Sequence, residues 1–190
     1  MGKRFNIIYA DPPWQFKTYS KKGSLQKSAD CHYSCLDIDE IMKLNISDIA
    51  ADDCILFLWV TFPLLKEGIE TILRWGFTYK TCGFNWVKRN KKADSWFMGL
   101  GYWTRSNSEI CLVGTKGHPK RISKSVSQIC DARVMEHSKK PDIIRDRIIE
   151  LCGELPRVEL FARKKTEGWT CLGNEIDGKD IHEAIKELAS

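Results

Sequence analysis

The feature that most restricts the fold is a run of seven apolar residues, CILFLWV, at positions 54–60. A strand that is apolar on both faces is buried on both sides, as is typical of a central strand in a parallel sheet covered by helices. A second short apolar run, FNIIYA at positions 5–10, stops at Asp11 and two prolines. These two segments predict an α/β fold in which both of them are buried strands inside the sheet.

The remaining segments alternate in the way that an α/β fold requires. Helices are expected where apolar residues recur at helical spacing: 36–44 with Asp37 as N-cap, 63–75 closed by Gly76, 141–152 and 180–188. Further strands are expected at 77–87, 108–115 and 158–162, and the weakly periodic segment 117–137 is expected to be loop with short pieces. Such alternation predicts a mostly parallel sheet with helices on both faces, and the absence of repeats or linker tracts predicts one domain, residues 1–190.

Composition excludes several classes of protein. With 43% hydrophobic and 29% charged residues, the chain is ordinary for a globular protein. No apolar run approaches the roughly 20 residues of a membrane-spanning helix, and no secretory signal is evident, so we expect a cytoplasmic protein without membrane contact. The eight cysteines include no C-x-x-C pair. Cys31, His32 and Cys35 are the only crowded metal-ligand types, and without a fourth ligand we expect no metal.

The formal net charge of +5 is mildly basic, and its distribution is informative. Three loop-like segments hold most of the clustered cations: Lys17, Lys21, Lys22 and Lys27; Lys88, Arg89, Lys91 and Lys92; Lys116, Lys120, Arg121 and Lys124. An aromatic set accompanies the second: Trp96, Phe97, Tyr102 and Trp103. Cations interleaved with aromatic rings favour a nucleic-acid partner.

The segment with the clearest chemistry is DPPW, residues 11–14, at the carboxyl end of the first strand. Ligands bind at that edge of open α/β sheets. A carboxylate and a backbone carbonyl that both accept from an exocyclic amine would direct its lone pair, and Trp14 would supply a stacking surface for an extruded base. The alternative is a proline-rich turn with Trp14 in the core.

DPPW resembles the motif of the adenine-N6 methyltransferase family that includes the messenger-RNA adenosine methyltransferase and short bacterial and phage DNA methyltransferases. The resemblance runs in order along the chain, through HYSCLDIDEIMKL from His32, ILFLWVT from Ile55, NSEICLVGTKG from Asn107, and then HSKKPDIIRDRIIELC, ELFAR and GWTCLGNE. It implies a Rossmann-like fold dependent on S-adenosylmethionine, with the cofactor half after the catalytic half, a circularly permuted motif order. The catalytic residues that it implies are Asp11, Pro12, Pro13 and Trp14.

The resemblance also implies the binding residues. Those for the cofactor are Asp11, Lys140, Phe161, Arg163, Asn174 and Glu175. Those for the nucleic acid are Trp14, Tyr33, Trp103, Arg105, Asn107 and Glu109. Glu175 is expected at the end of a strand, where an acid accepts from ribose hydroxyls. Arg163 stands where glycine-loop methyltransferases have glycine, which weakens the analogy to those enzymes only.

The favoured reaction is direct methyl transfer from S-adenosylmethionine to adenine N6 in DNA, by a monomer or a homodimer. RNA is the alternative substrate, although the short chain resembles the DNA-directed members more closely. Cytosine-N4 methylation is a second alternative, disfavoured because cytosine enzymes usually begin the motif with serine. A third is a non-catalytic nucleic-acid-binding partner, which would be expected to lose the DPPW acid or the GNE segment.

Overall fold

The computed structural model describes residues 2–14, 36–101, 103–136 and 139–190. Within them, seven strands form one sheet in the order β5-β3-β4-β2-β1-β6-β7. In chain order the strands are β1 Phe5–Ala10, β2 Ala50–Val60, β3 Thr78–Arg89, β4 Ser108–Lys116, β5 Ile129–Arg133, β6 Arg157–Leu160 and β7 Thr170–Leu172. Neighbouring strands are parallel except around β4, which runs antiparallel to both β2 and β3.

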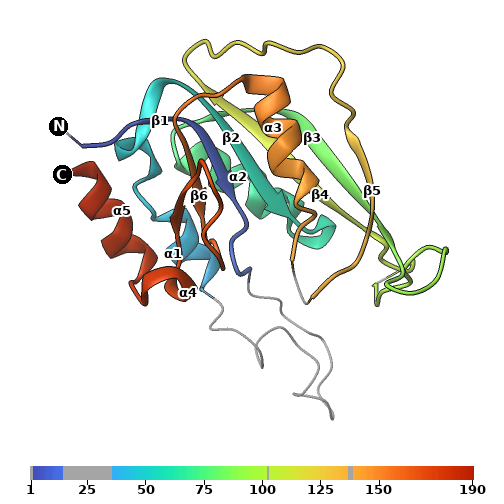
Figure 1. Cartoon of the computed structure of the whole chain (residues 1–190). Coiled ribbons are helices and arrows are strands. Elements are labelled where there is room, and N and C mark those ends of the chain that lie inside the picture. The colour runs from blue at the N-terminus through green and yellow to red at the C-terminus, as the bar shows by residue number, and fades with distance from the viewer. Residues whose placement is uncertain (1, 15–35, 102, 137–138) are drawn as a thin grey trace.

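Helices cover both faces of this sheet, as Figure 1 shows. On one face pack α1 (Ile38–Met42), α2 (Leu65–Arg74) and α5 (Ile181–Ala189), and on the other α3 (Ile143–Cys152). The alternation along β1 separates the two cores: Ile8 and Ala10 belong to the first, and Ile7 and Tyr9 to the second. The predicted fold class, mostly parallel with helices on both faces, is confirmed.

The strand order brings the two ends of the chain together. β1 lies between β2 and β6, and β6 pairs in parallel with β7. Ala10 at the end of β1 is level with Leu58 on one side and Leu160 on the other. Because β4 is antiparallel, its first residues reach the same edge, where Ile110 pairs with Val60. The permuted order therefore places the segments after β1, β6 and β7 beside the start of β4.

Most predicted elements occur within a few residues of their expected bounds, with two differences. After β2 the chain first makes a 3-10 turn, η4 (Phe62–Leu64), before α2 begins. The loop predicted over 117–137 was wrong in part, because it contains β5. β5 is an edge strand held by its pairing with β3, and by a bond of 2.9 Å that Trp86 Nε1 donates to the carbonyl of Ala132.

Three further properties concern the described part of the chain. None of its helices has the length and apolar character needed to cross a bilayer. Its six cysteines are unpaired, and four of them are buried: Cys54, Cys111, Cys130 and Cys152. Among these residues there is also no group of three potential metal ligands.

Candidate active site

The DPPW segment forms a tight turn directly after β1. The backbone N–H of Trp14 donates to the carbonyl of Pro12 over 2.9 Å, so the two residues are joined across Pro13. This carbonyl was expected to be free for the substrate, and the structure shows that one of its acceptor positions is in use. A carbonyl oxygen has two lone pairs, so one acceptor position is left.

Trp14 fastens this turn to the sheet. Trp14 is only 6% exposed and belongs to the core on the face of the sheet that α1, α2 and α5 cover. The indole N–H donates to the carbonyl of Trp59 on β2 over 2.9 Å. The position is that of a core side chain, which matches the alternative reading of DPPW. Base stacking by Trp14 stays a prediction, and it would require side chains packed on the ring to move.

Asp11 is the first member of a chain of alternating charges. Lys140 Nζ lies 2.9 Å from Asp11 Oδ1 and 3.2 Å from Glu109 Oε2. Glu109 also pairs with Lys88 through its other oxygen, Oε1. The four side chains come from the end of β1, the start of β4, the segment before α3 and the end of β3. Their order is acid, base, acid, base, so each internal charge is compensated on both sides.

Burial strengthens the interactions between these four charged side chains, because water screens buried charges poorly. Burial alone raises the pKa of Glu109, but Lys140 and Lys88 outweigh it and lower that pKa to about 2. Burial likewise lowers the pKa of Lys140, and Asp11 and Glu109 reverse the effect and raise it. For Asp11, burial raises the pKa, Lys140 opposes the rise and Glu109 adds to it. The carboxylate of Asp11 is thus the member of the chain that is easiest to protonate.

A cleft of about 290 Å³ opens beside Asp11 at the edge formed by β1 and β6. Nine charged residues line it. Five are cations and four are acids: Lys139, Lys140, Arg145, Arg163 and Lys164; Asp11, Glu136, Glu159 and Glu175. Tyr9 and Phe161 complete the lining. Five of the six residues predicted to bind a cofactor therefore meet in one cleft, and Asn174 does not line it.

The backbone around this cleft is unusual at two positions. Phe161, directly after β6, has a φ of 62°, the one positive value among the described non-glycine residues. Left-handed backbone at a bulky residue carries strain, and such residues cluster at functional sites. At Gly173 a Cβ would lie 2.2 Å from the carbonyl oxygen of Ala162, so only glycine allows this close approach of the two segments.

Glu175 was expected at the end of a strand, and that placement was wrong. β7 ends at Leu172, and Glu175 lies in the first turn of the short helix α4 (Asn174–Asp177). The close approach at Gly173 ends the strand and turns the chain into that helix. Glu175 still reaches the cleft, where its Oε1 lies 3.8 Å from Nε of Arg163.

Six residues that line the cleft were not predicted as site residues: Tyr9, Glu136, Lys139, Arg145, Glu159 and Lys164. Arg145 on α3 forms a fork with Glu159 on β6, at 2.8 and 2.5 Å, and lies 5.5 Å from the ring of Tyr9. Tyr9 in turn accepts a bond of 2.7 Å from Nε1 of Trp59. The sequence did offer one indication of the pair between Arg145 and Glu159: Glu159 follows Val158 and precedes Leu160 and Phe161 in a strand expected to be buried. A buried carboxylate needs a cationic partner.

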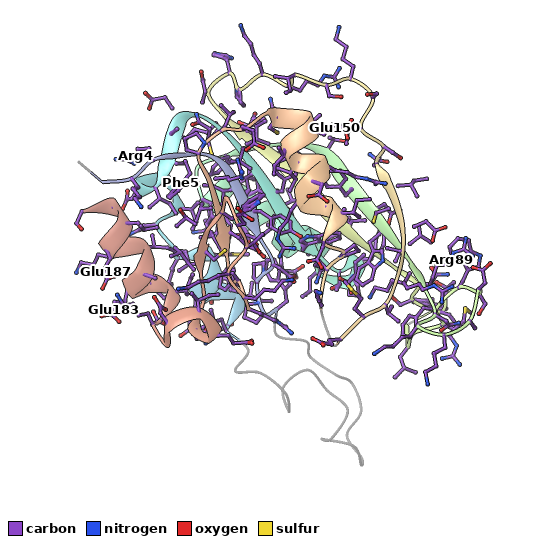
Figure 2. The ribbon with its side chains drawn as sticks, viewed as in Figure 1. Arg4, Phe5, Arg89, Glu150, Glu183 and Glu187 are labelled. Atoms are coloured by element: carbon purple, nitrogen blue, oxygen red, sulfur yellow. The ribbon has the colours of Figure 1, made fainter. Side chains whose placement is uncertain are left out.

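A second hollow, of about 550 Å³, lies beneath the β3–β4 loop, residues 90–107, which we call the arm. Figure 1 shows the arm extending past the end of β3, and Figure 2 labels Arg89 at its base, on the opposite side of the view from Glu183 and Glu187 on α5. Trp103, Arg105 and Asn107 line this hollow together with Thr61–Pro63 after β2. Trp103 is fully exposed, whereas Trp96 lies under the guanidinium of Arg89 at 3.8 Å.

Some predicted residues lie outside the described ranges. They are Tyr33, the first basic segment from Lys17 to Lys27, the cluster Cys31, His32 and Cys35, and Tyr102 of the aromatic set. Glu109 was predicted to contact the substrate, and in the structure its carboxylate forms ion pairs with two lysines.

The mostly parallel sheet with helices on both faces, together with the family match below, defines a Rossmann-like methyltransferase. A family model described as MT-A70 matches residues 5–175, and the chain belongs to this family of adenine-N6 methyltransferases, which use S-adenosylmethionine. The resemblance inferred from DPPW is thereby confirmed.

Curated relatives show the same similarity over nearly the whole chain. The type II methyltransferase M.MunI from a Mycoplasma species is 34% identical over 195 residues, which cover 94% of this chain and 81% of that protein. The human N(6)-adenosine-methyltransferase catalytic subunit METTL3 is 34% identical over 184 residues, and an MT-A70-like enzyme from Arabidopsis thaliana is 31% identical over 186. The chain spans only 29% and 25% of these two proteins.

Proposed function

We propose that this chain transfers a methyl group from S-adenosylmethionine to N6 of adenine in DNA. The observation that carries the proposal is the carboxylate of Asp11, held by Lys140 at the carboxyl end of β1, where the cofactor cleft meets the start of β4. This is the place where a substrate amine and a bound methyl donor would meet.

Asp11 acts on the amine through its charge and its position. The amine of adenine is a poor nucleophile because its lone pair is conjugated into the ring. When the amine donates one hydrogen to Asp11 and the other to the carbonyl of Pro12, the lone pair is turned out of conjugation. Trp14 serves this step indirectly, because its bonds to Pro12 and Trp59 fix the turn that carries both acceptors. The protein thus supplies orientation and electrostatics.

The residues of the cleft fit S-adenosylmethionine, which supplies the reactive methyl group when bound. The donor set matches its chemistry: the carboxylate of Glu175 would accept from the ribose hydroxyls, and Arg163, Lys139 and Lys164 would hold its carboxylate. Phe161 offers an apolar ring at a strained turn. Arg163 and Glu175 are half-exposed and 3.8 Å apart, so either can turn to a ligand at little cost.

The arm would hold the nucleic acid. Its hollow adjoins the charge chain, since Ser108 lines the hollow and the next residue, Glu109, pairs with Lys140. Exposed rings beside cations are the surface on which bases stack while phosphates are neutralised. Trp103 and Arg105 combine these two properties, and Lys91 and Lys92 add positive charge to the same loop.

DNA is favoured over RNA by the extent of the match to each relative. The chain matches the type II methyltransferase M.MunI along most of its length, whereas it corresponds to under a third of METTL3, whose name specifies adenosine. RNA remains the second candidate because the identity to METTL3 is as high. An acid at position 11 argues against cytosine, and the presence of Asp11, Lys140 and Glu175 in one site argues against a non-catalytic partner.

The test uses labelled S-adenosylmethionine with DNA and RNA of matched, randomised sequence, single-stranded and duplex, followed by digestion to nucleosides. N6-methyldeoxyadenosine from DNA is the expected product, and Asp11→Asn should not form it. Methylation of RNA alone, or N4-methylcytosine, would overturn the substrate assignment. Cofactor binding without any methylated nucleoside would overturn the assignment as an enzyme.

A further inference from the structure

We propose that Lys88 is a positioning residue for the methyl transfer: by neutralising Glu109, it keeps the charge of Lys140 directed at Asp11. The kinetic part of this inference rests on the function proposed above, while the electrostatic part concerns the protein alone. The family resemblance assigns no role to Lys88. This lysine was predicted to lie in a basic loop, and it lies in β3.

The geometry of the charge chain carries the inference. Glu109 has two oxygens and two cationic partners, with Lys88 on Oε1 and Lys140 on Oε2. Lys140 is in turn shared between Glu109 and Asp11, at 3.2 and 2.9 Å. Asp11 and Glu109 therefore compete for the ammonium group of Lys140. Lys88 reduces this competition, because it neutralises Glu109.

Low exposure makes this competition matter. The side chains of Lys88, Glu109 and Lys140 are 16%, 17% and 9% exposed, and that of Asp11 is 27% exposed. Water replaces a lost partner poorly at such positions, so an uncompensated carboxylate draws on the nearest cation. Without Lys88, Glu109 would draw on Lys140, and the four-membered chain would change from neutral to a net charge of −1.

The backbone around Lys88 fixes where its side chain begins. Its N–H donates to the carbonyl of Asn107 over 2.8 Å, and its own carbonyl accepts from Phe97 over 2.9 Å. Its ammonium group lies 4.9 Å from the ring centroid of Trp86, a cation–π distance. A largely buried cation held against one carboxylate is typical of a structural charge partner. A lysine that contacts phosphate would instead be exposed at the surface.

The inference predicts the pH dependence of the reaction. Asp11 must be ionised to accept from the amine, so the methylation rate falls on the acid side as Asp11 is protonated. Lys88→Met removes the cation that offsets Glu109, so the acid limb should move to higher pH, and kcat at neutral pH should fall by about ten- to a hundredfold. Glu109→Gln should move the limb to lower pH, because Glu109 raises the pKa of Asp11.

The decisive variant is the double one, Lys88→Met with Glu109→Gln, which removes one charge of each sign. Its acid limb should return towards that of the wild type, and Lys88→Arg should keep it there. Lys80→Met is the matched control, because Lys80 is an exposed lysine near the opposite end of the same strand. The titration of Asp11 should be followed in parallel by carboxyl ¹³C NMR, with Asp11→Asn to identify its signal.

Each outcome decides the matter. Opposite shifts in the single variants and recovery in the double variant support the inference. An unchanged acid limb and an unchanged Asp11 titration in Lys88→Met would overturn it, as would a double variant no closer to wild type than Lys88→Met. If no methylation is found on any nucleic acid, the NMR titration still tests the coupling, so failure of the proposed function and failure of this inference are distinguishable.

Discussion

The cofactor cleft and the arm meet at one edge of the sheet but are built in opposite ways. The cleft is lined by paired charges that join a strand end to α3 or the segment before it, such as Glu159 with Arg145 and Asp11 with Lys140. The arm is a long loop in which one of the two tryptophans, Trp103, is fully exposed. The proposed function thus assigns the chemistry, which needs fixed geometry, to the sheet, and contact with a variable polymer to a loop, which can adapt.

This comparison predicts that substitutions in the cleft change the rate of the chemical step, and that substitutions in the arm change substrate affinity. The largest effect is expected for Asp11→Asn, which keeps the shape of the side chain and removes its charge. Loss of one electrostatic contact to the reacting group typically costs about 10²–10³-fold. Single-turnover methylation measures the loss.

The matched control for that variant is Asp52→Asn. Asp52 is exposed near the start of β2, at the opposite end of the strands from Asp11, so its loss should leave the rate near that of the wild type. Equal rates for Asp11→Asn and the wild type would show that the carboxylate of Asp11 takes no part in the chemistry.

Lys140→Met is expected to be the next most severe, at about a hundredfold in kcat, because Asp11 loses the group that fixes it. Since Lys140 opposes the rise that burial causes in the pKa of Asp11, its removal lets that pKa rise further. The acid limb of the pH–rate profile should therefore move to higher pH. Lys66→Met, at an exposed lysine on α2, is the control, and a limb that does not move in Lys140→Met would separate Lys140 from Asp11 functionally.

Trp103→Ala tests the other half of the comparison. Base–aromatic stacking is worth about 1–3 kcal/mol, so KM for the nucleic acid should rise by roughly ten- to a hundredfold while single-turnover rates at saturation stay similar. Trp96→Ala should have a smaller effect, because Arg89 already lies over that ring. A fall in the saturated rate without a change in KM would place Trp103 in the chemical step.

The smallest effect is expected for Glu175→Gln, a few-fold weakening of S-adenosylmethionine binding in calorimetric titration. Glu175 is half-exposed, so water compensates part of the loss. Glu150→Gln provides a control, because Glu150 is exposed at the end of α3 that lies away from Lys140 and Arg145. Unchanged affinity in Glu175→Gln would remove this residue from the cofactor site.

The sequence predicts those parts of the molecule that depend on local pattern. The both-face apolar strands β1 and β2 and the helix α3 are found where their periodicity places them. β5 was missed because its pattern is weak and its stability comes from pairing with β3. The position of Glu175 was misjudged because β7 ends where Gly173 approaches Ala162, a contact between segments.

The same distinction holds for the site. DPPW and the C-terminal block were recognisable as motifs, and Asp11, Lys140, Phe161, Arg163 and Glu175 do lie together. The pairing of Glu109 with two lysines was not predicted, because nothing local in the sequence indicates it. Partnerships across the sheet depend on strand order and side-chain packing, which periodicity does not specify.

The central position of β1 also determines when the protein can become active during its synthesis. β1 precedes the other described strands in the sequence, its partner β6 begins only at Arg157, and Lys140 is separated from Asp11 by 129 positions. Until β6 emerges, β1 is an apolar edge strand, and open edges of this kind pair with other chains. Contacts so distant in sequence also form slowly. A nascent or truncated chain that lacks residues 157–190 is therefore expected to be inactive and prone to association, because the last strands both complete the cleft and cover the first.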